Sequence, residues 1–227
     1  MVYDVQKPMD QGVIFDMDGV LVDSYAAHFE SWKRLGRELG FSMSEEQFVA
    51  SFGRTSREVI RETWPHLASS DERVRQIDAR KEELFREIIA ADFPAMDGAA
   101  ELIDALAAAA FKLAVGSSGP PENVNLVLEK LARRDRFTAV VTGRDVTRGK
   151  PDPQVFQIAA ERLGLPTARC LVVEDAPAGI TAAKRAGAKC LGLVSTGREP
   201  AALAAADRVV RSLREVSPRD VRSMLSQ

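Results

Sequence analysis

The stretch GVIFDMDGVLVDS, residues 12–24, decides the fold, because its opening apolar run ends in two carboxylates set one residue apart. The apolar run predicts a buried strand. A buried carboxylate without a partner costs more free energy than so short a strand gains, so packing does not explain Asp16 and Asp18. If the extended geometry continues, both acids share a face and can address one site. We interpret them as metal ligands or catalytic groups. An acidic strand end or a helix cap is the alternative, which we prefer for Asp23 and Ser24.

The composition is that of a soluble globular protein, since 45% of the 227 residues are hydrophobic and 28% are charged. With 31 basic and 33 acidic residues the net charge is −2, so we expect neither nucleic acid nor an anionic membrane surface as a partner. No apolar stretch approaches the roughly 20 residues that cross a bilayer, and residues 1–10 lack the pattern of a signal peptide. Cys170 and Cys190 lie far apart and predict reduced core thiols. We therefore expect a cytoplasmic protein.

Two kinds of sequence follow one another along the chain. Residues 25–92 contain only helical patterns, which predict a helical insert. From residue 93 onward short apolar runs alternate with helices, which predicts a parallel sheet covered on both faces. We therefore expect an α/β fold. Its three-layer Rossmann-like core would comprise residues 1–24 and 93–227, and its inserted all-α domain residues 25–92.

Polar side chains follow the predicted strands, whose carboxyl ends meet at one edge of a parallel sheet. Asp16 and Asp18 follow the first strand, Ser117 the second, and Glu174 and Asp175 a later one. Carboxylates gathered in this way repel one another unless a cation lies among them. Oxygen ligands without His or Cys favour Mg²⁺ over zinc. The sequence therefore predicts a magnesium site at this edge.

A lysine in the segment GKPDP, residues 149–153, adds a positive charge to this set. The prolines restrict the backbone around Lys150, which suits a point charge that must be aimed, although a solvated loop lysine is the alternative. Together with a cation, the Ser117 hydroxyl and loop amides, it predicts a phosphoryl-binding site. A nucleotide-binding Walker loop is excluded, because residues 143–150 are one position too long and Pro151 replaces the required Ser or Thr. No GxGxxG motif supports a dinucleotide site.

Four motifs resemble, in chain order, those of the haloacid dehalogenase-like (HAD) superfamily. They are DMDGVLVDS (residues 16–24), the strand-end Ser117, GKPDP (residues 149–153) and EDAPAG (residues 174–179). The match spans nearly the whole chain, and the first and fourth motifs are highly specific. The helical insert directly after the first motif resembles the cap of the subgroup that contains β-phosphoglucomutase and the phosphoglycolate phosphatase-like enzymes.

The resemblance implies a role for each motif residue. Asp16 would attack phosphorus and become an aspartyl phosphate, while Asp18 would serve as general acid and then as general base. Mg²⁺ would be held by Asp16, the backbone carbonyl of Asp18 and Asp175, with Glu174 close by. The presence of the second aspartate argues against the dehalogenases and phosphonate hydrolases of the superfamily, which lack it. Three polar side chains would bind the phosphoryl oxygens: Ser117, Ser118 and Lys150.

Two acceptors for the phosphoryl group remain open, water in a phosphatase and a second sugar hydroxyl in a mutase. His28 stands where β-phosphoglucomutase has a His, and Trp32 follows one helical turn later, as a Trp does there. An ordinary surface or packing histidine is the alternative. In the substrate loop of the cap Gly53 and Arg57 match the mutase, whereas its lysine is missing. Arg54 or Arg57 would hold a second phosphate, or would simply be solvated.

Pro121 stands where the mutase has an asparagine that helps to bind the distal phosphate. We therefore predict a Mg²⁺-dependent phosphatase that acts on a small phosphorylated metabolite, in particular a sugar phosphate, through an aspartyl phosphate. A β-phosphoglucomutase-type mutase is the first alternative. A non-catalytic binding module on the same fold is the second, and the intact pair of reactive carboxylates argues against it. We expect a monomer or a weak homodimer.

Overall fold

The apolar run of the opening stretch forms the fully buried strand β1 (Gly12–Phe15) in a computed structural model that describes residues 10–51 and 55–227. In this part of the chain the strands form one parallel sheet in the order β3-β2-β1-β4-β5-β6. The predicted α/β fold with a parallel sheet is confirmed. The other strands are β2 (Lys112–Gly116), β3 (Ala139–Val141), β4 (Cys170–Glu174), β5 (Lys189–Leu193) and β6 (Arg208–Val210).

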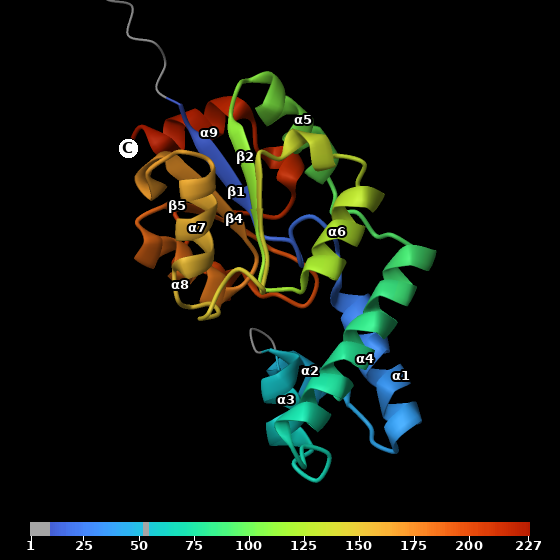
Figure 1. The fold of residues 1–227 in the computed structure, drawn as a ribbon. Coiled ribbons are helices and arrows are strands. Elements are labelled where there is room, and N and C mark those ends of the chain that lie inside the picture. Colours follow the sequence, from blue (N-terminus) through green and yellow to red (C-terminus); the bar gives the residue numbers. More distant parts are fainter. Residues whose placement is uncertain (1–9, 52–54) are drawn as a thin grey trace, which may run out of the picture.

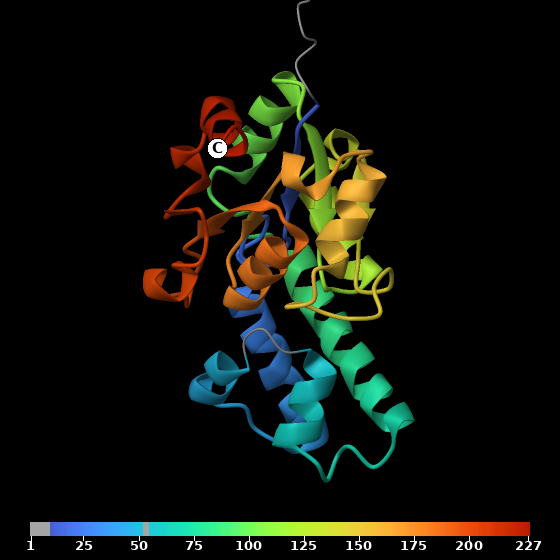
Figure 2. The same ribbon diagram turned by 90° about the vertical axis from the view of Figure 1, so that its left-hand side faces the viewer.

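Helices cover both faces of the sheet (Figures 1 and 2). Alternate residues of β1 point to opposite faces, so Val13 and Phe15 join one hydrophobic cluster and Ile14 joins the other. The first cluster includes residues of α5 (Ala99–Ala108), α6 (Pro121–Lys130) and α9 (Pro218–Leu225). The second includes residues of α7 (Gln154–Arg162) and α8 (Pro177–Ala186). Short 3₁₀ helices are η1 (Arg134–Arg136), η2 (Thr167–Arg169), η3 (Pro200–Leu203) and η4 (Leu213–Glu215).

In the described residues, four helices between β1 and α5 form a helical unit beyond the carboxyl ends of the strands (Figure 1). They are α1 (Tyr25–Leu39), α2 (Glu45–Ala50), α3 (Ser56–Thr63) and α4 (Asp71–Ala91). Capping boxes at Ser44 and Thr55 begin α2 and α3, and Gly40 with φ 78° ends α1. The unit has a hydrophobic cluster of its own, while α4 also packs on the sheet unit through Phe85 and Ile89.

The chain order places a ligand site at the carboxyl end of β1. From β1 the chain continues to β2 and β3 on one side, and later to β4, β5 and β6 on the other. The strand order therefore reverses between β1 and β4, where Phe15 pairs with Val173. Ligands of open parallel sheets bind in the crevice at such a reversal.

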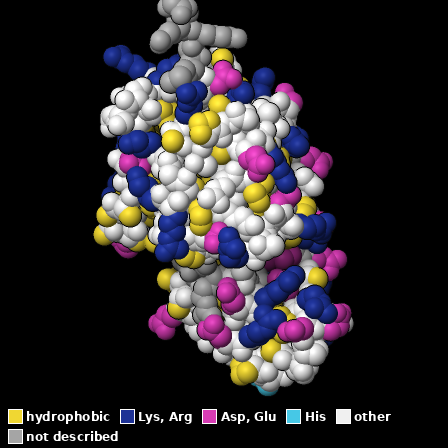
Figure 3. Space-filling model, turned by 60° about the vertical axis from the view of Figure 1, so that its left-hand side comes forward, with side chains coloured by type: hydrophobic (Ala, Val, Ile, Leu, Met, Phe, Trp, Pro, Cys, Tyr) yellow, Lys and Arg dark blue, Asp and Glu magenta, His cyan; other side chains and the backbone are white. Residues whose placement is uncertain are grey.

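None of the helices in the described residues is long and apolar enough to span a bilayer. On the face shown in Figure 3 Lys and Arg side chains alternate with Asp and Glu side chains, in keeping with the net charge of −2.

Candidate active site

Two adjacent strand ends bring the first and fourth motifs together. The backbone N–H of Asp16 donates to the carbonyl of Val173 at 2.9 Å, so Asp16 is still in register with β4. Gly19, with φ 73°, then turns the chain. A Cβ added there would lie 2.1 Å from Oδ2 of Asp175, so only glycine fits between the two motifs.

Lys150 bridges two buried carboxylates at this point. Its Nζ donates to Oδ1 of Asp16 and to Oε1 of Glu174, both at 2.6 Å. The other carboxylate oxygen of Glu174 accepts the backbone N–H groups of Asp175 and Ala176 at 2.9 Å. Glu174 is fully buried, so these bonds hold it in one place. The lysine therefore reaches the end of β1 from a loop 134 positions away.

The electrostatics of this cluster show an excess of negative charge. Burial raises the pKa of Asp16 well above its usual range; Lys150 opposes that rise, and the neighbouring acids add to it. Burial and Glu174 raise the pKa of Asp175 to about 6, although Arg198 and the Ser195 hydroxyl partly oppose this. Burial alone would lower the pKa of Lys150, but its two carboxylate partners raise it on balance, so it remains an ammonium.

The same acids fit a divalent cation. Asp16, Glu174 and Asp175 each place one carboxylate oxygen within 4.8 Å of the others. The donor set contains only carboxylates, which suits Mg²⁺ rather than zinc. The raised pKa values of Asp16 and Asp175 indicate that protein cations alone do not neutralise the cluster. The structure therefore contains an acidic cluster that can hold a metal ion, as the sequence predicts in part.

The Asp18 side chain contacts the helical unit and is not one of the three carboxylates of that cluster. Its Oδ1 lies 3.2 Å from Nε2 of His28, and Nζ of Lys81 lies 2.7 Å from Nδ1 of the same ring. An ammonium only donates, so Nδ1 accepts and Nε2 donates to Asp18. Burial alone would raise the pKa of Asp18, but His28 and Lys81 lower it on balance. The ring of His28 stacks on Phe85 with centroids 4.1 Å apart, which fixes its plane.

Polar contacts continue from Lys81 across to the sheet unit. Nζ of Lys81 donates to Oε1 of Glu82 at 2.9 Å, and Nδ2 of Asn123 donates to Oε2 of Glu82 at 2.6 Å. The carbonyl oxygen of Asn123 accepts from Arg86 at 2.9 Å. Lys81 is only 2% exposed and Asn123 only 1%. These four residues lie outside the four sequence motifs.

The loop after β2 faces Asp18 from the other side. The Ser117 side chain is buried, and its Oγ accepts the N–H of Gly119 at 3.0 Å, whereas Ser118 is exposed. A Cβ added at Gly119 would lie 3.2 Å from Oγ of Ser117 and 4.0 Å from Oδ2 of Asp18. Gly119 of this loop therefore lies beside Asp18, while the binding of a phosphoryl oxygen by Ser117 stays a prediction.

The predicted substrate-binding residues of the helical unit lie in different places. His28 contacts Asp18, whereas Trp32 is 3% exposed and packs 5.5 Å from the Trp64 ring, inside the unit's own cluster. Nζ of Lys81, which contacts His28, lies 5.8 Å from the centroid of the Trp32 ring, and a contact of Trp32 with substrate stays a prediction. Arg57 forms an ion pair with Asp78 at 2.6 Å. Gly53 and Arg54 lie outside the described residues.

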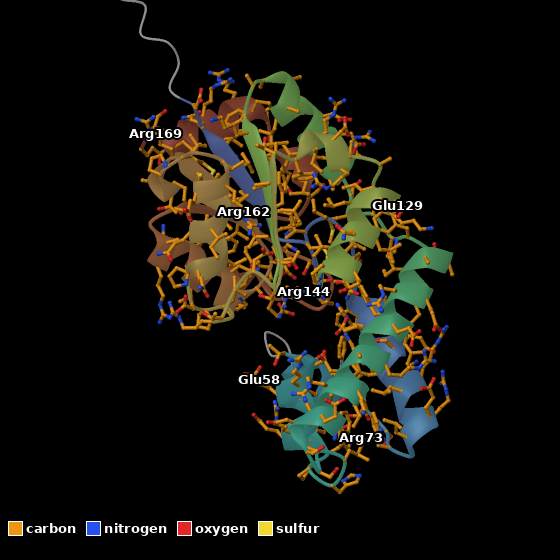
Figure 4. The ribbon with its side chains drawn as sticks, viewed as in Figure 1. Glu58, Arg73, Glu129, Arg144, Arg162 and Arg169 are labelled. Atoms are coloured by element: carbon orange, nitrogen blue, oxygen red, sulfur yellow. The ribbon has the colours of Figure 1, made fainter. Side chains whose placement is uncertain are left out.

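Two further residues complete the surroundings of Asp175. Oγ of Ser195, after β5, donates to Oδ2 of Asp175 at 2.7 Å, and Nε of Arg198 lies 3.5 Å from the same oxygen. A polar pair directly after a predicted strand is a signal that sequence reasoning could have used for them. Figure 4 shows Arg144, in the loop after β3, at the edge of the sheet unit that faces the helical unit, with Glu58 of α3 opposite. The site lies at that edge.

Comparisons with known proteins agree with the motifs. A family model described as a haloacid dehalogenase-like hydrolase matches residues 11–187. The validoxylamine A 7'-phosphate phosphatase of Streptomyces hygroscopicus subsp. limoneus is 35% identical over 206 residues, which cover 89% of this chain and 94% of the relative. The β-phosphoglucomutase of Bacillus subtilis (strain 168) is 30% identical over 216 residues, 91% of this chain and 92% of the relative.

Solved structures give the same result. The crystal structure of CbbY from Rhodobacter sphaeroides in complex with phosphate superposes with a TM-score of 0.82 at 26% identity. The match covers 91% of this chain and 96% of that one. The predicted resemblance is therefore confirmed in both sequence and fold.

Proposed function

We propose that this chain, which belongs to the haloacid dehalogenase-like hydrolase family, is a Mg²⁺-dependent phosphatase of a small phosphorylated metabolite, in particular a sugar phosphate. The observation that supports the proposal most is the position of Lys150, 2.6 Å from both Asp16 and Glu174 at the end of β1. An ammonium there screens the negative charge that a phosphate brings to an aspartate, which otherwise repels it.

In this proposal Asp16 is the nucleophile. One of its carboxylate oxygens forms a bond to phosphorus while the bond between phosphorus and the ester oxygen breaks, which gives an aspartyl phosphate. Lys150, the Ser117 hydroxyl and the exposed Ser118 bind the phosphoryl oxygens. Asp16, Asp175, Glu174 and the carbonyl of Asp18 would hold Mg²⁺, which when bound neutralises charge on the transferring group. Water then attacks the aspartyl phosphate and releases inorganic phosphate.

Asp18 is the proposed general acid and base. It gives a proton to the leaving oxygen in the first step and takes one from the attacking water in the second. Its pKa is low in the free protein because of His28. The negative charge of a bound phosphate opposes that effect and favours the protonated form that the first step needs.

The helical unit is the proposed cap, residues 25–92, that closes over the substrate. We further propose that the enzyme works in the cytoplasm as a monomer or weak homodimer. The mutase alternative is supported by the contact of His28 with Asp18 at 3.2 Å and by the 30% identity to the Bacillus β-phosphoglucomutase. The phosphatase is preferred because the Lys81 and Arg57 side chains in the cap are already paired with carboxylates, which leaves them unsuited to a second phosphate.

The test is the release of inorganic phosphate from p-nitrophenyl phosphate and from a panel of sugar phosphates, with Mg²⁺ and with EDTA. We expect Mg²⁺-dependent turnover that is lost in Asp16→Asn. Interconversion of β-glucose 1-phosphate and glucose 6-phosphate, primed by a bisphosphate and faster than hydrolysis, would establish the mutase instead. No turnover on any substrate would favour the binding module.

A further inference from the structure

Asn123 joins the sheet unit to the helical unit by both ends of its amide. It lies on α6, which begins just after the Ser117 loop, and its partners Glu82 and Arg86 lie one turn apart on α4. A carboxylate only accepts and a guanidinium only donates, so the two partners fix the orientation of the amide. Because Asn123 is buried, neither contact is replaced by water at no cost.

An unbroken chain of polar contacts runs from this amide to Asp18. Glu82 accepts from Asn123 at 2.6 Å and from Lys81 at 2.9 Å, and the Ser56 hydroxyl donates to the same carboxylate at 3.0 Å. Lys81 continues to His28, which contacts Asp18. Each member thus depends on the next for its position.

Packing alone does not explain this buried polar link. Phe85 and Ile89 of α4 already share a hydrophobic cluster with Val124 and Val127 of α6, so the two helices stay together without Asn123. Apolar contacts tolerate small sliding of one helix along another, whereas a two-ended hydrogen bond to positions 82 and 86 fixes the place of α4 along its axis. The hydrogen bonds of Asn123 therefore fix where α4 lies along α6, while apolar packing holds the two helices together.

We propose that Asn123 is a positioning residue for proton transfer: through Glu82, Lys81 and His28 it holds the Asp18 carboxyl where the leaving oxygen of the substrate must be protonated. The inference rests on the proposed function and deepens it. A general acid has to lie within hydrogen-bond reach of its target, and a displacement of about 1 Å costs up to about 100-fold in rate. Because α6 directly follows the Ser117 loop, Asn123 also keeps Asp18 at a fixed position relative to that loop.

The test compares two aryl phosphates of similar shape. Phenyl phosphate releases a phenol with pKa about 10 and needs a proton from the acid, whereas p-nitrophenyl phosphate releases a stable anion and does not. In Asn123→Ala we expect kcat/KM to fall at least about tenfold for phenyl phosphate and less than about threefold for p-nitrophenyl phosphate. Asn125→Ala, an exposed asparagine on the same helix, is the matched control and should change neither.

A second variant separates geometry from loss of fold. In N123D/E82Q the carboxylate and the amide exchange places, which keeps the hydrogen bond between the two helices, the net charge and a partner for Arg86, while Lys81 contacts an amide oxygen in place of its carboxylate. We expect it to regain at least half of the lost activity on phenyl phosphate. Equal losses on both substrates, or no loss on either, in Asn123→Ala would overturn the inference while leaving the phosphatase intact. A wild-type enzyme that hydrolyses neither ester would overturn the proposed function as well.

Discussion

Gly179 gives the sharpest prediction, because two ordinary rules disagree about Gly179→Ala. Gly179 lies inside α8, where alanine should stabilise a helix by about 1 kcal/mol relative to glycine. A Cβ at this position, however, would lie 1.8 Å from Oε1 of Glu174, and ordinary contact begins at 3.4 Å. The buried carboxylate has to move, although it is held by Lys150 and by two backbone N–H groups.

The cost of that movement follows from the bonds that it breaks. A hydrogen bond to a charged group contributes about 1.5–3 kcal/mol and leaving a buried donor unpaired costs about 1–3 kcal/mol, so a loss of about 1.5–5 kcal/mol remains after the gain in helix propensity. For a chain of 227 residues this lowers the melting temperature by about 3–20 °C. Because Lys150 also contacts Asp16, hydrolysis of p-nitrophenyl phosphate should fall as well.

The assay is thermal unfolding together with the rate of p-nitrophenyl phosphate hydrolysis. Gly149→Ala is the matched control, since a Cβ there meets nothing within 4 Å although the next residue is Lys150. We expect the control to keep its melting temperature and rate. If Gly179→Ala keeps or raises the melting temperature and retains full activity, the reasoning about how Glu174 is held is refuted.

Three further predictions concern charge. Lys150→Met leaves two buried carboxylates without their cation, so thermal unfolding should show a loss of about 3–5 kcal/mol and phosphate release should stop; retained stability would contradict this. Mg²⁺ should raise the melting temperature more at pH 8 than at pH 5. The pKa of Asp175 is raised to about 6 in the metal-free protein, so metal-free stability falls as pH rises from about 4 to 6, and below pH 6 protons compete with the metal. A pH-independent shift would contradict it. Arg57→Ala removes a pair with Asp78 in which the arginine is 52% exposed, so stability should change by at most about 1 kcal/mol and monophosphate turnover by less than about twofold. A large rise in KM for a bisphosphate alone would show that Arg57 binds a second phosphate.

The acidic core of the site could be predicted from the sequence because the topology of a parallel sheet determines which residues meet. Asp16 and Asp175 are far apart in the chain, but both follow buried apolar runs, and parallel strands end at one edge. The glycine after Asp18 was also informative, since a turn at that point needs a positive φ and a side chain there would collide with Asp175. Short-range patterns and one topological rule were therefore enough.

The contacts of the helical unit could not be predicted in the same way. The burial of Lys81 is visible in the sequence, because Lys81 continues the helical spacing of Val74, Ile77 and Leu84 and so lies on the apolar face of α4. Its partner could not be found from that pattern. Glu82 and Asn123 are 41 positions apart on two helices, and their contact depends on how α4 lies against α6. No spacing within either helix encodes it.

Arg86 bears on whether the site binds one phosphate group, as a phosphatase does, or a second one, as a mutase does. Arg57 and Lys81 face carboxylates at 2.6 and 2.9 Å, so their charges are already compensated. Arg86 instead donates to the neutral amide of Asn123, and the Glu122 carboxylate offsets part of its charge. A second phosphate bound there would draw the guanidinium from Asn123 and loosen the link that positions Asp18. The positioning role of Asn123 and a mutase reaction at Arg86 therefore compete for the same side chain, and a chain that relies on the first is better suited to release phosphate to water.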